Sequence, residues 1–264
     1  MSEARPLRVV HEGRIATLVL DRPRALNTLD FAMMDALVEG IGEVARSDAR
    51  VLVVTGAGPH FMAGGDLRAF ATALERPEAE RAALFRPLLA RLHAAIETLN
   101  RMPQVVIAQA RGAVAGFGLS LLCACDLAIA ADDAYFTAAY RHIGLSPDGG
   151  GTHALTRLVG TRKALEIFLL GERFDAAEAL RLGIVNRVVP GGELDAAVAA
   201  LARTLANGPA LALRNTKALV RGAHGRSLSG QLDAEADSFA ACTGTPDFAE
   251  GIASFIAKRP PRFR

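Results

Sequence analysis

The fold is decided by residues 105–130, which read VVIAQARGAVAGFGLSLLCACDLAIA. An apolar run of strand length (105–110) ends in a glycine-spaced turn, and a helical stretch (116–124) then leads into a second apolar run (126–130). Apolar strands separated by helices are typical of a parallel sheet that is covered on both faces. This stretch therefore predicts an α/β fold built from strand, turn and helix units.

The same alternation extends outward from this stretch. Asp30 can cap a helix that runs to about residue 44, and a second helix is expected over residues 82–101, with Pro87 in its first turns. Residues 68–81 are polar and rich in alanine, and they fit either a mobile loop or a short helix. Further strands are expected at residues 7–10, 15–20, 51–54, 134–137 and 185–189. Further helices are expected at residues 152–159, 193–206, 210–222, 228–241 and 246–258.

Composition limits the class of protein. With 264 residues, 51% hydrophobic and 22% charged, the chain is expected to fold as a globular protein. A net charge of +2 lacks the basic stripe of a nucleic-acid binder. No apolar run is long enough to cross a bilayer, and the polar start MSEARPLRVVHEG has no signal-peptide core. We therefore expect a cytoplasmic protein without nucleic-acid or membrane partners, with its three cysteines as free, buried thiols and with no metal site.

Residues 144–152, GLSPDGGGT, hold Asp148 between a proline and three glycines. Proline restricts the chain before the acid, while the glycines permit a sharp turn and close approach of a ligand. A carboxylate held rigidly in a loop that opens into a helix suits a general base. The alternative is that Asp148 only caps the helix or closes a turn.

Two other glycine-rich turns follow apolar strands, at residues 61–67 (FMAGGDL) and 112–119 (GAVAGFGL). Each can leave backbone N–H groups unpaired and pointing at one spot, and two such donors form an oxyanion hole. A helix that begins near Phe117 would add the positive end of its dipole. The alternative is that these glycines only allow tight packing of strand on helix.

Motifs for other chemistries are absent or incomplete. The run Gly56-Ala57-Gly58 lacks the later glycine of a dinucleotide fingerprint, and neither a phosphate loop nor a Gly-x-Ser-x-Gly elbow occurs. His142 and His153 flank the Asp148 loop, which leaves a nucleophile–His–Asp set open, with Ser146 or Thr152 as the nucleophile.

Over nearly its full length the chain resembles the crotonase superfamily, also called the enoyl-CoA hydratase/isomerase family. The motifs that carry the resemblance, in family order, are Arg22-Pro23 with Asn27 and Leu29, residues 61–67, residues 112–118 with Cys125-Asp126, residues 144–152, residues 157–160, residues 176–187 and residues 250–259.

The resemblance implies a crotonase-like spiral of ββα units over residues 1–200, which would hold CoA and the active site. It implies a C-terminal helical region over residues 201–264 that joins subunits into a homotrimer or a dimer of trimers. The expected partner is an acyl-CoA thioester, and no separate cofactor is expected because CoA is part of the substrate.

The resemblance also assigns the site residues. The family's catalytic oxyanion donors fall on the N–H groups of Gly65 and Phe117, beside Asp148. The expected substrate contacts are Arg24, Ala25, Leu26 and Ala63 near the adenine, Asp66 and Leu67 after the first donor, Tyr140 in the acyl pocket with Phe117, and Phe255 and Lys258 in a tail that reaches a neighbouring subunit's CoA.

The departures from the family pattern indicate the reaction. Hydratases of this family use two glutamates on one water, and these would fall at Ser120 and Tyr140, which are neutral at pH 7. Asp148 instead resembles the single acid of the epoxyphenylacetyl-CoA isomerase and Δ3,Δ2-enoyl-CoA isomerase branches. The sequence therefore predicts an acyl-CoA isomerase that moves a double bond, or opens a ring epoxide, through a thioester enolate, with Asp148 as the only acid/base. A hydratase, an enzyme with Asp148 as nucleophile, and a catalytically silent CoA-ester-binding protein remain as alternatives.

Overall fold

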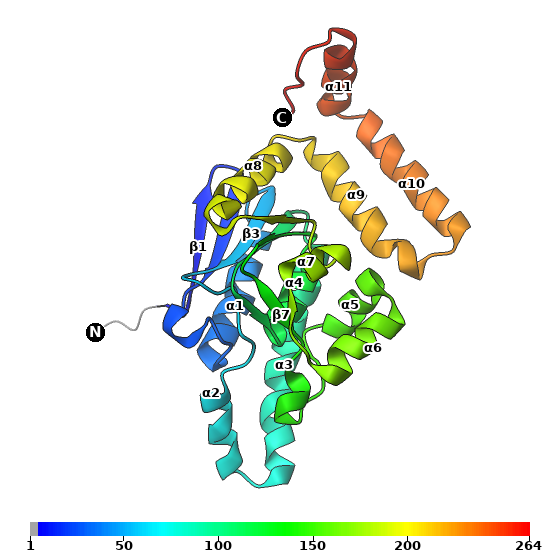
Figure 1. The fold of residues 1–264 in the computed structure, drawn as a ribbon. Coiled ribbons are helices and arrows are strands. Elements are labelled where there is room, and N and C mark those ends of the chain that lie inside the picture. The colour runs from blue at the N-terminus through cyan, green and yellow to red at the C-terminus, as the bar shows by residue number, and fades with distance from the viewer. Residues whose placement is uncertain (1–4) are drawn as a thin grey trace.

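The main sheet has six strands in the order β1-β2-β3-β4-β6-β9 (Figure 1). The computed structural model describes residues 5–264, so the first four residues of the polar N-terminal segment lie outside the described residues. β1 and β2 lie at two of the predicted strands and pair antiparallel as a hairpin, and β2, β3, β4, β6 and β9 run parallel to one another. The strands are β1 Leu7–Glu12, β2 Ile15–Leu20, β3 Val51–Gly56, β4 Val105–Ala110, β6 Leu127–Ala131 and β9 Arg187–Val189.

A second, three-stranded sheet gives the fold its repeating unit. It contains β5 (Ala113–Ala115), β7 (Tyr135–Thr137) and β8 (Phe174–Asp175) in the order β5-β7-β8. Along the chain, β4 joins the main sheet, β5 joins the small sheet, and helix α4 (Phe117–Ala124) follows; β6, β7 and α5 (Gly151–Val159) repeat this order. The predicted spiral of ββα units is thereby confirmed. The sequence did not predict β5, which lies inside the glycine-rich turn.

Helices cover both faces of the main sheet. α1 (Phe31–Ala45) and α3 (Glu78–Arg101) pack on one face, and α8 (Leu194–Ala206) packs on the other. Alternate residues of β3 serve the two layers: Leu52 and Val54 belong to the larger core, and Val51 and Val53 to the α8 core. This two-sided burial explains why the strands read as continuous apolar runs.

In the region before β4, one open question is answered and one expectation needs correction. Of the two alternatives for residues 68–81, the short helix is the one found: α2 spans Leu67–Ala71, a 3-10 turn spans Thr72–Glu75, and α3 begins at Glu78. Because α3 begins earlier than residue 82, Pro87 lies well inside the helix and not in its first turns. Proline has no N–H, so it cannot donate the helical hydrogen bond at that position. α2 and α3 project together from the body (Figure 1).

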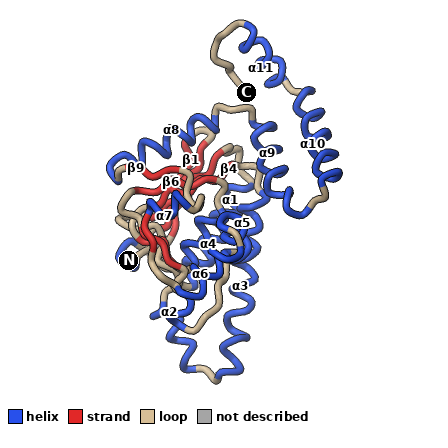
Figure 2. Tube along the Cα trace, turned by 45° about the vertical axis from the view of Figure 1, so that its right-hand side comes forward, coloured by secondary structure: helices blue, strands red, loops and turns tan. Residues whose placement is uncertain are grey.

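The C-terminal helices form an arm that extends away from the two sheets (Figure 2). The expected boundary between residues 200 and 201 falls inside α8, which packs on the sheet through Ala206, so the arm begins later, with α9. The arm helices are α9 Ala210–Gly222, α10 Leu228–Thr243 and α11 Pro246–Ile256. The other helices are α6 Thr161–Leu170 and α7 Ala176–Arg181. Large apolar side chains that the arm exposes are Leu228, Leu232, Phe239, Phe248, Ile252, Phe255 and Ile256.

A buried cation anchors the arm to the body. The Lys217 ammonium of α9 donates to the carbonyls of Leu99 (3.0 Å) and Gln104 (2.8 Å) and pairs with Asp126 at 2.8 Å. Arg221, one turn further along α9, pairs with the same carboxylate at 2.8 Å. Because burial of the ammonium lowers the pKa of Lys217, the Asp126 carboxylate and the two carbonyls are needed to keep it charged.

The cysteine prediction holds for two residues of three. Cys123 and Cys125 are buried free thiols, and burial raises the pKa of Cys123 to about 12, whereas Cys242 is only half-buried. No three His, Cys, Asp or Glu side chains within residues 5–264 cluster as a metal site would require. In the same range no single helix is long and apolar enough to span a bilayer, although α8 and α9 together pass that test across a 106° bend.

Candidate active site

The two glycine-rich turns that hold the predicted donors Gly65 and Phe117 lie side by side. Met62 forms a parallel bridge with Val114, and the N–H of Ala115 donates to the carbonyl of Met62 at 2.9 Å. Further along, a Cβ on Gly64 would lie 3.6 Å from the Cα of Gly116. The residues that directly precede the two predicted donors are therefore neighbours.

A glycine with positive φ precedes each donor. Gly64 has φ +84° and Gly116 has φ +51°, a region that other residues rarely adopt. A Cβ on Gly64 would lie 3.2 Å from the carbonyl oxygen of Ala115, so the two backbones are in contact. Among the described residues 5–264, no group accepts a hydrogen bond from the N–H of Gly65 or of Phe117. Both amides are therefore available to a ligand.

The direction of the Gly65 amide follows from its neighbours. The N–H of Leu29 donates to the carbonyl of Gly64 at 2.8 Å, and the N–H of Asp66 donates to the carbonyl of Leu29 at 3.0 Å. The carbonyl of Gly64 and the N–H of Gly65 belong to one planar trans peptide and point in opposite directions, so the N–H of Gly65 points away from Leu29. Phe117 begins α4, where free N–H groups and the helix dipole favour negative charge. Together the two amides can stabilise a negatively charged oxygen.

Asp148 is held against α4 by two hydroxyl groups. The Tyr140 hydroxyl donates to Oδ1 of Asp148 at 2.7 Å, and the Ser120 hydroxyl donates to the Asp148 main-chain carbonyl at 2.9 Å. The two hydroxyl oxygens lie 3.0 Å apart. Ser120 lies in the first turns of α4, so this bond brings the acid beside Phe117. The Asp148 side chain does not cap α5, whose N-cap is Gly150 without a side-chain bond.

Burial makes Asp148 a stronger base than a free aspartate. The pKa of its carboxyl is raised, chiefly because burial disfavours the charged form; the hydrogen bond from Tyr140 and the charge of His93 oppose this effect. Burial and the neighbouring carboxylate likewise raise the pKa of Tyr140, so its hydroxyl stays protonated and acts as a donor. No second carboxylate of the described chain is among the groups that shift the pKa of Asp148.

One neighbour of Asp148 is not predicted by any pattern in the sequence. His93, on α3, accepts a hydrogen bond at Nε2 from the N–H of Gly149, at 3.4 Å. A single histidine on an amphipathic helix carries no motif, and only the packing of α3 beside the loop shows its position. Neither Ser146 nor Thr152 is hydrogen-bonded to His142 or His153 in the part of the chain described, so no nucleophile–His pair forms there.

The segments expected to contact the adenine lie side by side. The N–H of Ala63 donates to the carbonyl of Leu26 at 3.1 Å, which joins the 3-10 turn Pro23–Ala25 to the first glycine-rich turn. Ala25 accepts bonds from the main chain and hydroxyl of Thr28. Within residues 5–264 the carbonyls of Arg24 and Ala63 accept none. These two carbonyls are therefore the free acceptors of the predicted set.

Other members of the predicted substrate set are placed differently. The Asp66 side chain is already used, because it pairs with Arg22 at 2.9 Å and accepts from the N–H groups of Arg68 and Ala69 at the start of α2. Burial pushes the pKa of Asp66 upward, but these bonds outweigh it and the pKa is lowered. A structural role thus replaces direct substrate contact for this side chain. Leu67 begins α2 and is half exposed.

Phe255 and Lys258 do not join the site within one chain. Phe255 lies on α11, 85% exposed, and Lys258 follows that helix in a left-handed conformation with φ +49°. α11 is at the far end of the arm, remote from α4 and α5 (Figure 1). A contact of these residues with the same chain's active site is therefore not formed.

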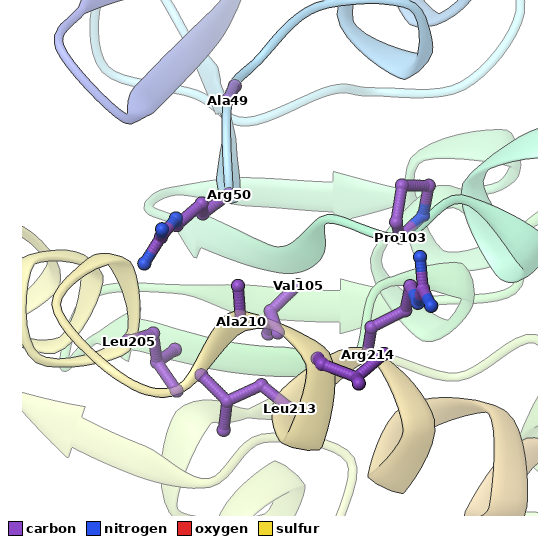
Figure 3. A pocket seen from close by; sticks show the side chains of 9 residues that line it. Ala49, Arg50, Pro103, Val105, Leu205, Ala210, Leu213 and Arg214 are labelled. Carbon is purple, nitrogen blue, oxygen red and sulfur yellow. The ribbon is translucent and has the colours of Figure 1, made fainter. Parts of the chain in front are cut away.

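A separate pocket of about 330 Å³ lies at the N-terminal ends of the central strands β3 and β4 (Figure 3). Arg50 and Arg214 lie on opposite sides of an apolar floor that includes Val105 and Leu213. No carboxylate lines it, and it contains none of the residues that surround Asp148. This pocket is therefore distinct from the candidate site around Asp148.

The spiral of ββα units is the architecture of the crotonase fold. Residues 11–264 match the family model described as "Enoyl-CoA hydratase/isomerase". The chain belongs to the enoyl-CoA hydratase/isomerase family.

Relatives of this chain carry the names of both reactions. It is 36% identical to a probable enoyl-CoA hydratase of Rhodobacter capsulatus, covering 96% of this chain and 95% of the relative. It is 35% identical to the 1,2-epoxyphenylacetyl-CoA isomerase of Escherichia coli, with coverage of 96% and 95%. The crystal structure of an enoyl-CoA hydratase from a Polaromonas species superposes with a TM-score of 0.91 at 33% identity, covering 98% of this chain and 99% of that one. The similarity therefore establishes the family but does not separate hydratase from isomerase.

Proposed function

We propose that this protein is an enoyl-CoA isomerase that moves a double bond into conjugation with the thioester, using Asp148 as its only acid/base. The observation that carries the proposal is the environment of Asp148: within residues 5–264 its neighbours are the hydroxyls of Tyr140 and Ser120 and the imidazole of His93, and no second carboxylate bonds to it. One carboxylate suffices for proton transfer between two carbons, because the same group acts first as base and then as acid.

The proposed step is balanced without any co-reactant. A 3-enoyl-CoA binds with its thioester oxygen between the N–H groups of Gly65 and Phe117. Asp148 takes a proton from the α-carbon, and the electron pair of that C–H bond passes to the oxygen as a dienolate. Asp148 then returns the proton to the γ-carbon, and the double bond forms between the α- and β-carbons.

Each group near the acid has a defined task in this mechanism. Tyr140 occupies Oδ1 of Asp148, whereas Oδ2 accepts no hydrogen bond from residues 5–264 and is left for the proton. The raised pKa of Asp148 makes the carboxylate a better match for a weakly acidic C–H. The two amides stabilise the dienolate oxygen, and removal of one such donor typically costs about 3–4 kcal/mol in the barrier.

Hydration is the second candidate, because relatives that cover nearly the whole chain are named as hydratases. Hydration needs one group to activate water and another to deliver a proton to the α-carbon. Asp148 could serve as one of these groups, but the hydroxyl that bonds to it, that of Tyr140, has a raised pKa, and the His93 imidazole accepts from the main-chain N–H of Gly149. Such a hydroxyl is a weak acid and a poor base at neutral pH.

Turnover in deuterated water separates these candidates. The protein is incubated with a 3-enoyl-CoA and, in a parallel reaction, with a 2-enoyl-CoA, and the products are analysed by mass spectrometry and NMR. Deuterium at the α- or γ-carbon without an added hydroxyl supports isomerisation, whereas a 3-hydroxyacyl-CoA product supports hydration. Binding of both esters without any exchange would identify a silent binding protein, and a covalent ester on Asp148 would identify nucleophilic chemistry.

The assembly proposal follows from the family. We infer that neighbouring copies cover the exposed apolar side chains of the arm in a homotrimer or a dimer of trimers. In that arrangement Phe255 and Lys258 would contact the CoA bound by a neighbouring copy, and the free carbonyls of Arg24 and Ala63 would accept hydrogen bonds from the adenine. The arm's projection from its own body is the feature that supports this (Figure 2).

A further inference from the structure

One arginine connects the caps of two helices beside the oxyanion donors. A single terminal nitrogen of Arg22, Nη2, contacts Oδ2 of Asp30 and Oδ2 of Asp66, each at 2.9 Å. Its other terminal nitrogen, Nη1, donates to the carbonyl of Thr28 at 2.6 Å. The three charged side chains are only 22%, 22% and 16% exposed, so this cluster is shielded from water.

Both carboxylates in the cluster are helix caps. Asp30 accepts from the N–H of Met33 at 2.7 Å and caps α1. Asp66 accepts at Oδ1 from two N–H groups at the start of α2, at 3.1 and 3.3 Å. Oδ1 of Asp66 accepts the capping hydrogen bonds and Oδ2 pairs with Arg22, so both oxygens of the side chain are held in place.

Asp66 is also the residue directly after the donor Gly65. Its own N–H is bound to the carbonyl of Leu29 at 3.0 Å, so the chain on the C-terminal side of Gly65 is held by main-chain and side-chain bonds together. α2 is a short helix, Leu67–Ala71, whose Leu67 is exposed and whose Phe70 packs against the rings of Phe31 and Phe85. The chain after Gly65 is therefore held by this ring packing and by the bond between Asp66 and Arg22.

We propose that Arg22 is a positioning residue that fixes the Gly65 amide in the oxyanion hole by clamping Asp66 to Asp30. Removal of the guanidinium leaves two carboxylates facing each other without a counter-charge, and their repulsion moves the start of α2 and the donor before it. Oxyanion stabilisation is lost steeply when a donor is displaced. The inference rests on the proposed oxyanion role of Gly65, but it does not depend on whether the enzyme isomerises or hydrates.

The test measures enolate stabilisation without catalytic turnover. Acetoacetyl-CoA is bound to the enzyme, and its enolate is followed by ultraviolet absorbance as pH is varied. In Arg22→Gln the equilibrium constant for enolate formation on the enzyme should fall about 10- to 100-fold, in line with loss of one donor. The dissociation constant of butyryl-CoA, which forms no such enolate, should change less than about threefold. Arg22→Lys should give a value between those of the wild type and Arg22→Gln, because one ammonium can contact the two acids but supplies no second nitrogen fixed toward the Thr28 carbonyl.

A second variant covers the case in which Arg22→Gln does not fold. Asp66→Asn keeps a good N-cap but weakens the ion pair, so it should shift the enolate equilibrium in the same direction. Arg91→Gln is the matched control, because it removes an arginine from an exposed pair with Asp35 (2.8 Å) and should leave the enolate unchanged. Folding is checked for every variant by circular dichroism and Tm.

Two results would overturn the proposal. One is an unchanged enolate equilibrium in folded Arg22→Gln or Asp66→Asn. The other is a loss of enolate that is matched by an equal loss of butyryl-CoA binding, which would indicate a purely structural role. If the wild type shows this enolate signal but produces no shifted double bond, the proposed function fails while the role of Arg22 stands.

Discussion

Replacement of Asp148 by asparagine tests the single-base mechanism most directly. Asparagine has nearly the same shape, and its carbonyl can still accept the 2.7 Å hydrogen bond from Tyr140. The Ser120 bond goes to the main-chain carbonyl of residue 148, so the substitution leaves it in place. The change therefore removes the base with little disturbance of the loop.

The expected magnitude follows from the surroundings of the acid. A positioned general base contributes about 10²–10⁴ in rate, or about 3–5 kcal/mol in the barrier. No carboxylate within residues 5–264 contributes to the pKa shift of Asp148, so we expect no neighbouring acid to substitute for it and a loss of kcat near the upper figure. KM should change little, since the interaction is made only with the reacting proton.

The assay is the conversion of a 3-enoyl-CoA to its conjugated 2-enoyl isomer, followed by absorbance, with binding measured by calorimetry. Ser120→Ala is the control: it removes one hydrogen bond of 2.9 Å to the loop, worth about 1 kcal/mol, so a loss of about fivefold is expected. Turnover of Asp148→Asn within tenfold of the wild type would refute the single-base mechanism. A greater loss in Ser120→Ala than in Asp148→Asn would point to water chemistry through Ser120.

The remaining predictions concern the oxyanion donor, the arm and pH. Gly65→Ala should lower kcat about 100-fold, because the added Cβ would lie 2.5 Å from the Phe70 ring and shift the donor. The double variant Gly65→Ala/Phe70→Ala should recover part of the activity, and no recovery would contradict this cause. Lys217→Met should lower the unfolding free energy by about 3 kcal/mol in denaturant titrations, because Asp126 loses a buried cation, and a loss near zero would refute the anchoring role. The pKa of Asp148 is higher in the folded than in the unfolded state, so ionisation of this carboxyl destabilises the folded protein as pH rises from the unfolded-state pKa to the folded-state pKa. Asp148→Asn lacks this effect, so its Tm minus that of the wild type should increase with pH across this window. A decrease would contradict the raised pKa.

The parallel core could be predicted from the sequence because its signals are local. The apolar runs of β3 and β4 are buried on both faces, and Asp30 caps α1 through Met33 as the pattern indicated. β5 was missed because Ala113–Ala115 is short, small in side chain and enclosed by glycines, so its strand character arises only from pairing with β7. Tertiary pairing here overrides a local turn signal.

The candidate site was predictable in its main chain but less so in its side chains. Glycine spacing indicated the donor turns, and Asp148 stood out between proline and glycine. The engagement of Asp66 by Arg22 joins residues distant in sequence, so no local pattern could show that its carboxylate is already satisfied. The same holds for His93, whose place beside Gly149 depends on how α3 packs.

The alignment of the two glycine-rich turns affects how the reaction of a related sequence can be inferred. Every residue except proline has a main-chain N–H, so a substitution at Phe117 leaves its donor in place. The two backbone donors are therefore retained while the side chains around them change. In the proposed mechanism, the kind of reaction depends instead on the side chains at positions 120, 140 and 148. Percentage identity over the whole chain therefore indicates whether a related sequence retains the two backbone donors. The residues at positions 120, 140 and 148 are a better guide to the reaction that such a sequence catalyses.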